Sequence, residues 1–211
     1  MIVAIASVEG HYKTHLSANL AVLRARSGRK ICSIDTDTTE FAYSWGCDRS
    51  IAAQAPWVMA RTLSGPMLSR EIANLGPSYG DLLINTGGHG RHETLTALIA
   101  ARIVIVPVTV DQVDLDVHYA LMARLNSARM FNPALKVIFV FVTDSSTPSP
   151  QQMAAVRLYV AQVMSATLTH TVLHVHGTYD YGLGRCVCDA ETCDPEAAAE
   201  FNSLYHEVYI H

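Results

Sequence analysis

Short apolar runs alternate with amphipathic stretches along most of this 211-residue chain. An uninterrupted apolar run is typical of a strand buried on both faces of a parallel sheet, whereas apolar residues three and four positions apart indicate a helix. Strands are predicted over residues 1–6, 30–34, 81–85, 103–108 and 137–143, with a short last strand over 172–175. Helices are predicted over 14–26, 93–101, 113–131, 150–166 and 195–209, and residues 48–73 are predicted to hold one or two helices broken near Gly65 and Pro66.

The alternation of strands and helices predicts the fold class. Successive strand–helix units build a parallel sheet with helices on both faces. No internal repeat or linker divides the chain, and its 211 residues are enough for one domain with a substantial core. We therefore predict an α/β fold in which a single domain over residues 1–211 contains one doubly wound, mainly parallel sheet of about six to eight strands.

Polar residues follow the predicted strands. Five of them stand at or just after the end of a predicted strand or of the loop that follows it: Lys13, Asp37, Asn85, Asp111 and Asp144. Because ligands of doubly wound sheets bind beyond the carboxyl ends of the strands, this placement predicts one shared site at that edge.

Composition and charge narrow the class of protein. Half of the residues are hydrophobic and 16% are charged, which is typical of a globular chain and excludes a disordered one. The formal net charge of −4 argues against a strongly basic nucleic-acid-binding surface overall, although not against a local basic patch. The five cysteines are an odd number in a chain of this size, which argues against a disulfide framework.

The first and last residues of the sequence and the length of its apolar runs indicate the cellular compartment that we expect. The sequence begins with an apolar strand and not with a charged leader, and no apolar run approaches the roughly 20 residues of a membrane span. The last predicted helix is acidic and lacks the basic face of a membrane anchor. We expect a cytoplasmic protein without a membrane partner.

The loop between the first strand and the first helix has the layout of a phosphate-binding loop. Gly10, His11, Tyr12, Lys13 and Thr14 lie there. In such a loop the backbone N–H groups and the helix N-terminus hold phosphate, the lysine reaches the outer phosphates and the hydroxyl binds magnesium. The full G-x-x-x-x-G-K-[ST] pattern is absent, because Ser7 and Tyr12 occupy its two glycine positions. An ordinary strand–loop–helix turn with a surface lysine is the alternative.

The order of motifs along the chain resembles the ParA/MinD family of deviant Walker ATPases. In that family a K-G-G-x-G-K-T loop precedes a helix with N-L-A, and the next strand ends D-x-D, followed by an Ala and a Trp. The matching residues here are Lys13, Thr14, Asn19, Leu20, Ala21, Asp35, Asp37, Ala42 and Trp45. Residues 85–88, 101–107, 132–136 and 194–200 resemble later family segments, so the resemblance covers nearly the whole chain.

The resemblance implies ATP or ADP and Mg²⁺ as ligands and a role for each matching residue. Asp37 would orient the attacking water. The nucleotide would be held by Gly10, His11, Tyr12, Lys13, Thr14, His15 and Asp144. Thr14, Asp35 and Asn85 would surround the metal, and Gly87 and Gly88 would form a switch-like segment.

Four positions depart from the family pattern. Val8 replaces the signature lysine, Glu9 and Tyr12 replace loop glycines, and Asn85 replaces an aspartate. Valine cannot stabilise charge on a leaving phosphate, and an amide brings no negative charge to magnesium. We therefore expect nucleotide binding and ATP hydrolysis to be weakened or lost. The alternatives are an active ATPase with an altered loop and a nucleotide-free interaction scaffold.

The resemblance also implies partners. It predicts a ParA-like protein of plasmid or mobile-element DNA partition or positioning, which forms a homodimer and meets a ParB-like adaptor. It implies nonspecific DNA as well, but the arginines that would bind it are few and scattered, at Arg61, Arg70, Arg124 and Arg129.

Two groups of residues could hold metal. His89 and His92 flank Gly90 and Arg91 in the segment after the third predicted strand, and Cys186, Cys188 and Cys193 follow His174 and His176. Neither group has a standard zinc spacing. The alternative for Cys186 and Cys188 is a short strand with one buried face.

Overall fold

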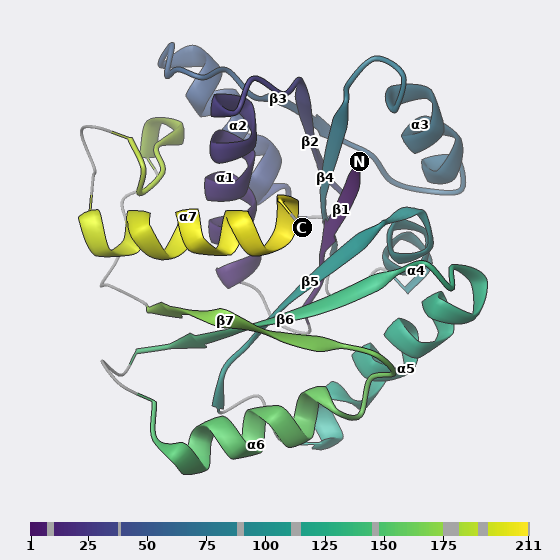
Figure 1. The fold of residues 1–211 in the computed structure, drawn as a ribbon. Helices are drawn as coiled ribbons and strands as arrows, with labels where there is room; N and C mark the ends of the chain where they lie inside the picture. Colours follow the sequence, from purple (N-terminus) through teal and green to yellow (C-terminus); the bar gives the residue numbers. More distant parts are fainter. Residues whose placement is uncertain are drawn as a thin grey trace.

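The computed structural model describes residues 1–7, 11–37, 39–87, 91–110, 115–144, 148–174, 182–189 and 194–210. Seven strands form one parallel sheet in the order β3-β2-β4-β1-β5-β6-β7 (Figure 1). They are β1 (Ile2–Ile5), β2 (Ile31–Asp35), β3 (Met59–Thr62), β4 (Asp81–Asn85), β5 (Ile103–Val108), β6 (Lys136–Thr143) and β7 (Thr167–His174).

Helices cover both faces of the sheet. One face carries α1 (His11–Arg26), α2 (Phe41–Ile51) and α7 (Pro195–Tyr209), and the other carries α3 (Leu68–Leu75), α4 (Arg91–Ala100), α5 (Leu115–Phe131) and α6 (Pro150–Val160) (Figure 1). Right-handed crossovers require this division, because the chain first winds from β1 toward β3 and then back toward β7. The predicted doubly wound, parallel α/β fold is confirmed.

Alternation along the central strands supplies a core on each face. In β1, Val3 and Ile5 pack toward α1 and α7, while Ala4 packs toward α3, α4 and α5. All three side chains are fully buried, as expected for a central parallel strand. Among the described residues, no helix has the length and apolar character needed to cross a membrane.

Five element predictions were wrong. Helix α2 begins at Phe41, and the edge strand β3 was missed because two of its four residues are exposed, the other two are partly buried, and the strand shows no apolar run. Helix α6 ends at Val160 and β7 begins at Thr167, because polar threonines interrupt the apolar pattern of this edge strand. Cys186 and Cys188 lie in a turn and not in a strand; the turn is closed by a hydrogen bond from the Asp189 N–H to the Cys186 carbonyl (3.1 Å).

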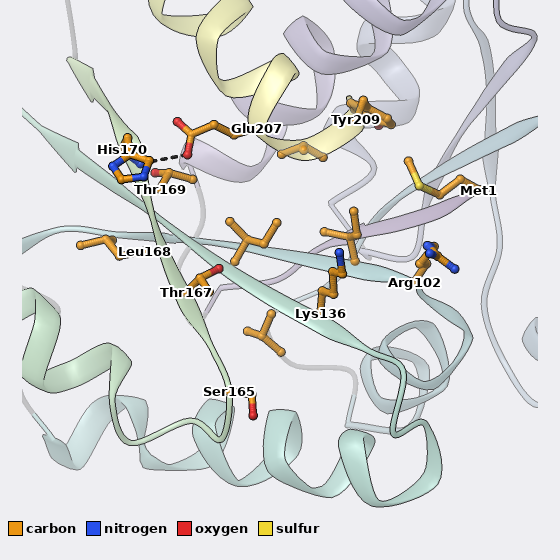
Figure 2. Close-up of a pocket in the computed structure, with 14 residues that line it drawn as sticks. Met1, Arg102, Lys136, Ser165, Thr167, Leu168, Thr169, His170, Glu207 and Tyr209 are labelled. Carbon is orange, nitrogen blue, oxygen red and sulfur yellow. Dashed lines mark hydrogen bonds between the residues drawn. The ribbon is translucent and has the colours of Figure 1, made fainter. Parts of the chain in front are cut away.

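Helix α7 covers the outer edge of β7 through two glutamates. Glu207 accepts hydrogen bonds from the backbone N–H groups of His170 (2.9 Å) and Thr171 (2.8 Å), and Glu200 accepts one from the N–H of His174 (2.9 Å). These bonds satisfy edge groups that could otherwise pair with another strand. Below Glu207, at the amino-terminal edge of the sheet, a cavity opens between α7 and the first residues of β5, β6 and β7 (Figure 2).

A buried carboxylate ties α1 to the start of β4. Asp81 is 1% exposed and accepts hydrogen bonds from Arg24 (2.8 Å), Arg29 (3.0 Å) and the amino group of Met1 (2.8 Å). Burial alone would raise the pKa of the Asp81 carboxyl, but hydrogen bonds from these three cations outweigh it and lower the pKa to about 2.

Asp81→Asn is expected to lower the free energy of unfolding by about 3 kcal/mol, because it leaves the partly buried Arg24 without its counter-ion. Since the folded-state pKa lies below the ordinary value of 3.8, the stabilising effect is present above that value and lost as pH falls through about 2. Urea denaturation at pH 7 and pH 3 measures both effects. Arg29→Gln, which removes a half-exposed partner, serves as a control and should cost less than about 1 kcal/mol. Equal losses in the two variants would contradict the prediction.

Candidate functional site

The carboxyl ends of β1, β2 and β4 lie level with one another. Asn85 is the register partner of both Ile5 in β1 and Asp35 in β2. The loops that leave these strands therefore meet at one edge of the sheet. Helix α1 brings Lys13 to the same place, so the residues that the sequence placed at three strand ends are brought together.

Lys13 is the cation of this edge. Its side chain is 3% exposed, and its Nζ donates a hydrogen bond to the Thr86 carbonyl (2.7 Å) and lies 3.6 Å from an Asp37 carboxylate oxygen. Burial lowers the pKa of the Lys13 ammonium, and the charges of Asp37 and Asp35 oppose that effect. Lys13 is therefore a desolvated cation that an additional negative group, such as phosphate, would stabilise.

Asp35 holds the start of α2. One carboxylate oxygen accepts hydrogen bonds from the backbone N–H groups of Ala42 (2.8 Å) and Tyr43 (3.1 Å), and the other accepts from the N–H of Asp37 (3.0 Å) and the Asn85 amide (3.4 Å). The residue at the N-cap of α2, Glu40, makes no side-chain cap. Asp35 thus caps a neighbouring helix from the end of β2 and favours its N-terminal dipole.

Asp35→Asn is expected to destabilise the metal-free protein by about 2 kcal/mol, because the amide would turn a donor toward backbone N–H groups that need an acceptor. Thermal denaturation in EDTA measures this loss, and Asp37→Asn, at a more exposed site, is the matched control with a smaller effect. A loss of stability that appeared only with Mg²⁺ present would contradict the capping role and favour the predicted metal role.

Gly87 makes a close approach to Asp37. A Cβ atom on Gly87 would lie 3.2 Å from the Asp37 Cα and 3.3 Å from the Thr36 carbonyl oxygen. The Gly87 carbonyl also accepts a hydrogen bond from the Thr94 hydroxyl (2.9 Å). The residues that follow β4 and β2 are therefore packed backbone to backbone, and a displacement of Gly87 would displace Asp37.

The Asn85 side chain presents an unused oxygen. Asn85 is 2% exposed, and its Oδ1 has no hydrogen-bond partner among the described residues. Burying an acceptor without a partner costs free energy, so a water or a cation with its water shell fits this atom. Oxygen donors suit Mg²⁺, and Thr14 in the first turn of α1 remains the predicted hydroxyl ligand. The site can thus offer magnesium neutral oxygen donors.

The other predicted nucleotide-binding residues lie at varied depths. Tyr12 is partly buried and packs against the core beneath α1 and α7. His15 meets the ring of Phe201 in α7 edge-on, with 4.9 Å between ring centroids, and burial lowers its pKa to about 4, so it is neutral at pH 7. Asp144 is exposed just after β6. Gly10, Gly88 and the side chain of His11 lie outside the described residues.

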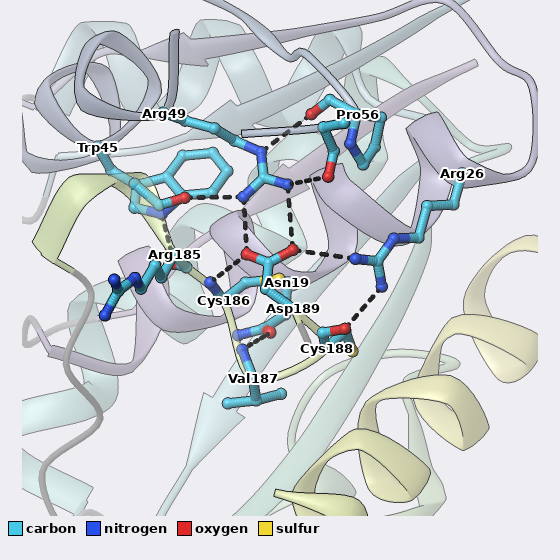
Figure 3. A network of polar contacts seen from close by, with 12 residues as sticks. Asn19, Arg26, Trp45, Arg49, Pro56, Arg185, Cys186, Val187, Cys188 and Asp189 are labelled. Carbon is cyan, nitrogen blue, oxygen red and sulfur yellow. Dashed lines mark hydrogen bonds and ion pairs between the residues drawn. The ribbon is translucent and has the colours of Figure 1, made fainter. Parts of the chain in front are cut away.

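A polar network that sequence reasoning missed lies at the C-terminal ends of α1 and α2, away from Lys13. Arg49 of α2 is fully buried and forms a two-pronged ion pair with Asp189 (2.9 and 3.2 Å), and it also donates to the carbonyls of Ala55, Pro56 and Gly184 (Figure 3). Gly184 has φ +68°, and a Cβ there would lie 2.1 Å from the Arg49 backbone nitrogen, so this contact requires glycine.

Two motif residues of the resemblance hold the same segment. Asn19 accepts a hydrogen bond from the Val187 N–H (3.0 Å), and the Trp45 indole donates to the Arg185 carbonyl (2.8 Å) (Figure 3). Both side chains therefore anchor residues 182–189 against α1 and α2. Their place in the motif was the signal that could have pointed to this network.

Among the described residues, the structure provides no cluster of side chains for the predicted histidine and cysteine metal sites. Within the described ranges, no group of three or more His, Cys, Asp or Glu side chains could hold a metal ion. Cys193, His89 and His176 lie outside those ranges.

Solved structures share this architecture over nearly the whole chain. McdA from Cyanthece aligns with a TM-score of 0.71 at 12% identity and covers 99% of both chains. A plasmid partition protein from Borrelia burgdorferi, bound to AMPPNP, aligns with a TM-score of 0.69 at 13% identity over 99% of this chain and 97% of its own. MinD from Aquifex aeolicus aligns with a TM-score of 0.67 at 13% identity over 100% and 97%. No protein-family model matches the sequence, and no curated protein matches it significantly.

The sheet order and the two helical layers give this chain a P-loop NTPase-like α/β fold, which the neighbours share. Its structural neighbours include a plasmid partition protein, MinD and McdA, so the predicted resemblance to the ParA/MinD family is confirmed at the level of the fold.

Proposed function

We propose that this chain is a ParA-like positioning protein of plasmid or mobile-element partition, with nucleotide binding and ATP hydrolysis weakened or lost. The observation that carries the proposal is the buried Lys13, which lies at the shared edge of β1, β2 and β4 beside two carboxylates. A desolvated lysine at this position suits the phosphates of ATP or ADP. The neighbouring Asn85 oxygen suits the water shell of Mg²⁺.

Three features support weakened activity. The Lys13 ammonium already has a carbonyl and a carboxylate partner, so phosphate must replace contacts that exist without it. Both oxygens of Asp35 are engaged by backbone N–H groups, which leaves Asp37 as the more accessible carboxylate for orienting a water. The replacement of the signature lysine by Val8 removes a positive charge from the transition state.

A nucleotide-free scaffold is the second candidate function. It is favoured by the same internal pairing of Lys13 with Asp37 and Thr86, because a site whose polar groups satisfy one another has less need of a ligand. In either case we propose a cytoplasmic homodimer that meets a ParB-like adaptor. The Borrelia burgdorferi neighbour is a plasmid partition protein, which supports this choice of class.

Calorimetric titration of ATP and of ADP, with and without Mg²⁺, tests the proposal, followed by steady-state turnover with DNA present. Weak magnesium-dependent binding with slow turnover is the expected result. Turnover equal to that of intact ParA-type ATPases would favour the active enzyme instead. No binding at millimolar nucleotide would favour the scaffold.

A further inference from the structure

A cavity lies at the amino-terminal edge of the sheet, on the opposite side of the molecule from Lys13. Its volume is about 490 Å³, and it lies between the last turns of α7 and the first residues of β5, β6 and β7 (Figure 2). This volume falls in the range of small-molecule sites. The function proposed above makes no use of it.

The cavity is apolar along its floor. Ile103 and Ile138 line it from the strands, and Val208 lines it from α7; all three belong to the core on the α7 face of the sheet. The ring of Tyr209 beside them is held in place, because it stacks on Tyr205 (5.0 Å between centroids) and lies under the Arg24 guanidinium (4.5 Å). An alkyl or aromatic group could therefore be desolvated there.

A bulge in β7 shapes one wall. The register between β6 and β7 pairs Phe139 with Leu168 but Phe141 with Val172, so β7 carries two extra residues. Glu207 of α7 holds this bulge by accepting from the N–H groups of His170 and Thr171 and from the Thr171 hydroxyl. Bulges re-aim side chains and are common beside binding sites.

Two cations stand at the other end. Arg102 precedes β5, Lys136 begins β6, and a backbone hydrogen bond from the Lys136 N–H to the Arg102 carbonyl (3.0 Å) makes them neighbours. In the part of the chain that the structure describes, neither side chain has a hydrogen-bond or ion-pair partner. Figure 2 shows the Lys136 ammonium turned toward the middle of the cavity.

The one carboxylate in the lining does not neutralise these cations. Glu207 is engaged by the bulge, and although burial would raise its pKa, the hydrogen bonds from Thr171 and His170 lower it. The cavity thus has an apolar floor, a carboxylate already hydrogen-bonded to the bulge at one end (Glu207), and two cations without partners among the described residues at the other (Arg102 and Lys136).

We propose that this cavity binds a small amphipathic anion, with its carboxylate or phosphate head at Arg102 and Lys136 and its apolar body against Ile103, Ile138 and Val208. Charge complementarity selects the head, and the apolar floor selects the body. The site would be independent of nucleotide, because it lies at the opposite edge of the sheet.

Calorimetric titration of the whole chain with octanoate and with octyl phosphate tests the proposal, with octan-1-ol and inorganic phosphate as controls. One-to-one binding of an octyl anion is expected, weaker at high salt and unchanged by ATP. The tighter of the two anions identifies the head group. Equal binding of octan-1-ol would overturn the role of the cations, and equal binding of inorganic phosphate would overturn the role of the floor.

Variants of exposed residues distinguish binding in this cavity from nonspecific binding of the octyl anions to the protein surface. Arg102→Gln with Lys136→Gln should weaken octanoate binding by about tenfold or more. Thr167→Trp, on an exposed lining residue, should block binding by filling the cavity, and Arg70→Gln on the opposite face should leave it unchanged. Unchanged melting temperatures would confirm that the variants fold. Binding that survives both lining changes, or no binding of either anion at millimolar concentration, would overturn the proposal.

Discussion

Replacing Arg49 with methionine is expected to lower the free energy of unfolding by about 4 kcal/mol, the largest effect of any single change we predict. The guanidinium is fully buried, and its loss would leave the Asp189 carboxylate with only one charged partner, Arg26. It would also leave the carbonyls of Ala55 and Gly184 without their donor. Chemical denaturation at pH 7 measures the loss.

Arg26→Met is the matched control for Arg49. Arg26 donates to the same carboxylate (2.9 Å) but is 37% exposed, so solvent screens it and we expect a loss of about 1 kcal/mol. A double-mutant cycle with Asp189→Asn should show strong coupling to Arg49 and weak coupling to Arg26. Equal losses from the two arginine variants would show that burial does not set the strength of the Asp189 ion pair.

Lys13→Met is expected to weaken ATP binding by about a hundredfold while changing the free energy of unfolding by less than about 1 kcal/mol. The charged hydrogen bond to phosphate is lost, but burial already opposes the charge of Lys13 in the free protein. An apolar side chain of similar length therefore costs the fold little. Calorimetry gives the affinity, and denaturation gives the stability.

The protonation of Lys13 gives a second test of its role. Burial lowers its pKa from 10.5, so the charged form is disfavoured in the free protein, and the fold gains stability as pH rises through the lowered value toward 10.5. Bound phosphate would raise this pKa, so nucleotide binding at a pH between the lowered value and 10.5 should take up protons in the wild type but not in Lys13→Met. The dependence of the binding enthalpy on the buffer measures that uptake. Lys30→Met, at a surface lysine over the Tyr79 ring, is the control. A nucleotide affinity that is unchanged in Lys13→Met would exclude the phosphate role.

The edge site could be predicted from the sequence because strand ends carry their own signals. Asp35 and Asn85 directly end apolar runs, and a parallel sheet places such ends together. Their contacts could not be predicted in the same way. Asp35 was expected near a metal, but one of its oxygens accepts hydrogen bonds from the first N–H groups of α2. The start of α2 at Phe41 has no side-chain cap, so the sequence carries no signal for this contact. The metal role of Asp35 stays a prediction.

The Arg49–Asp189 pair shows why the rest could not be predicted. The two residues are separated by 140 positions, and an arginine in a helix ordinarily extends into solvent. The residues around Arg49 in the sequence do not predict its complete burial. Only the packing of residues 182–189 over α2 surrounds it with acceptors.

The amino-acid sequence by itself determined the alternation of strands and helices, the parallel sheet and the edge at which Lys13, Asp37 and Asn85 gather. It could do so because hydrophobic periodicity and crossover handedness are local rules. The tertiary structure alone decided which polar groups pair, that residues of the β7 bulge line a cavity, and that Arg102 and Lys136 stand beside it. These features depend on contacts between segments distant in the chain, where burial and geometry outweigh any local preference.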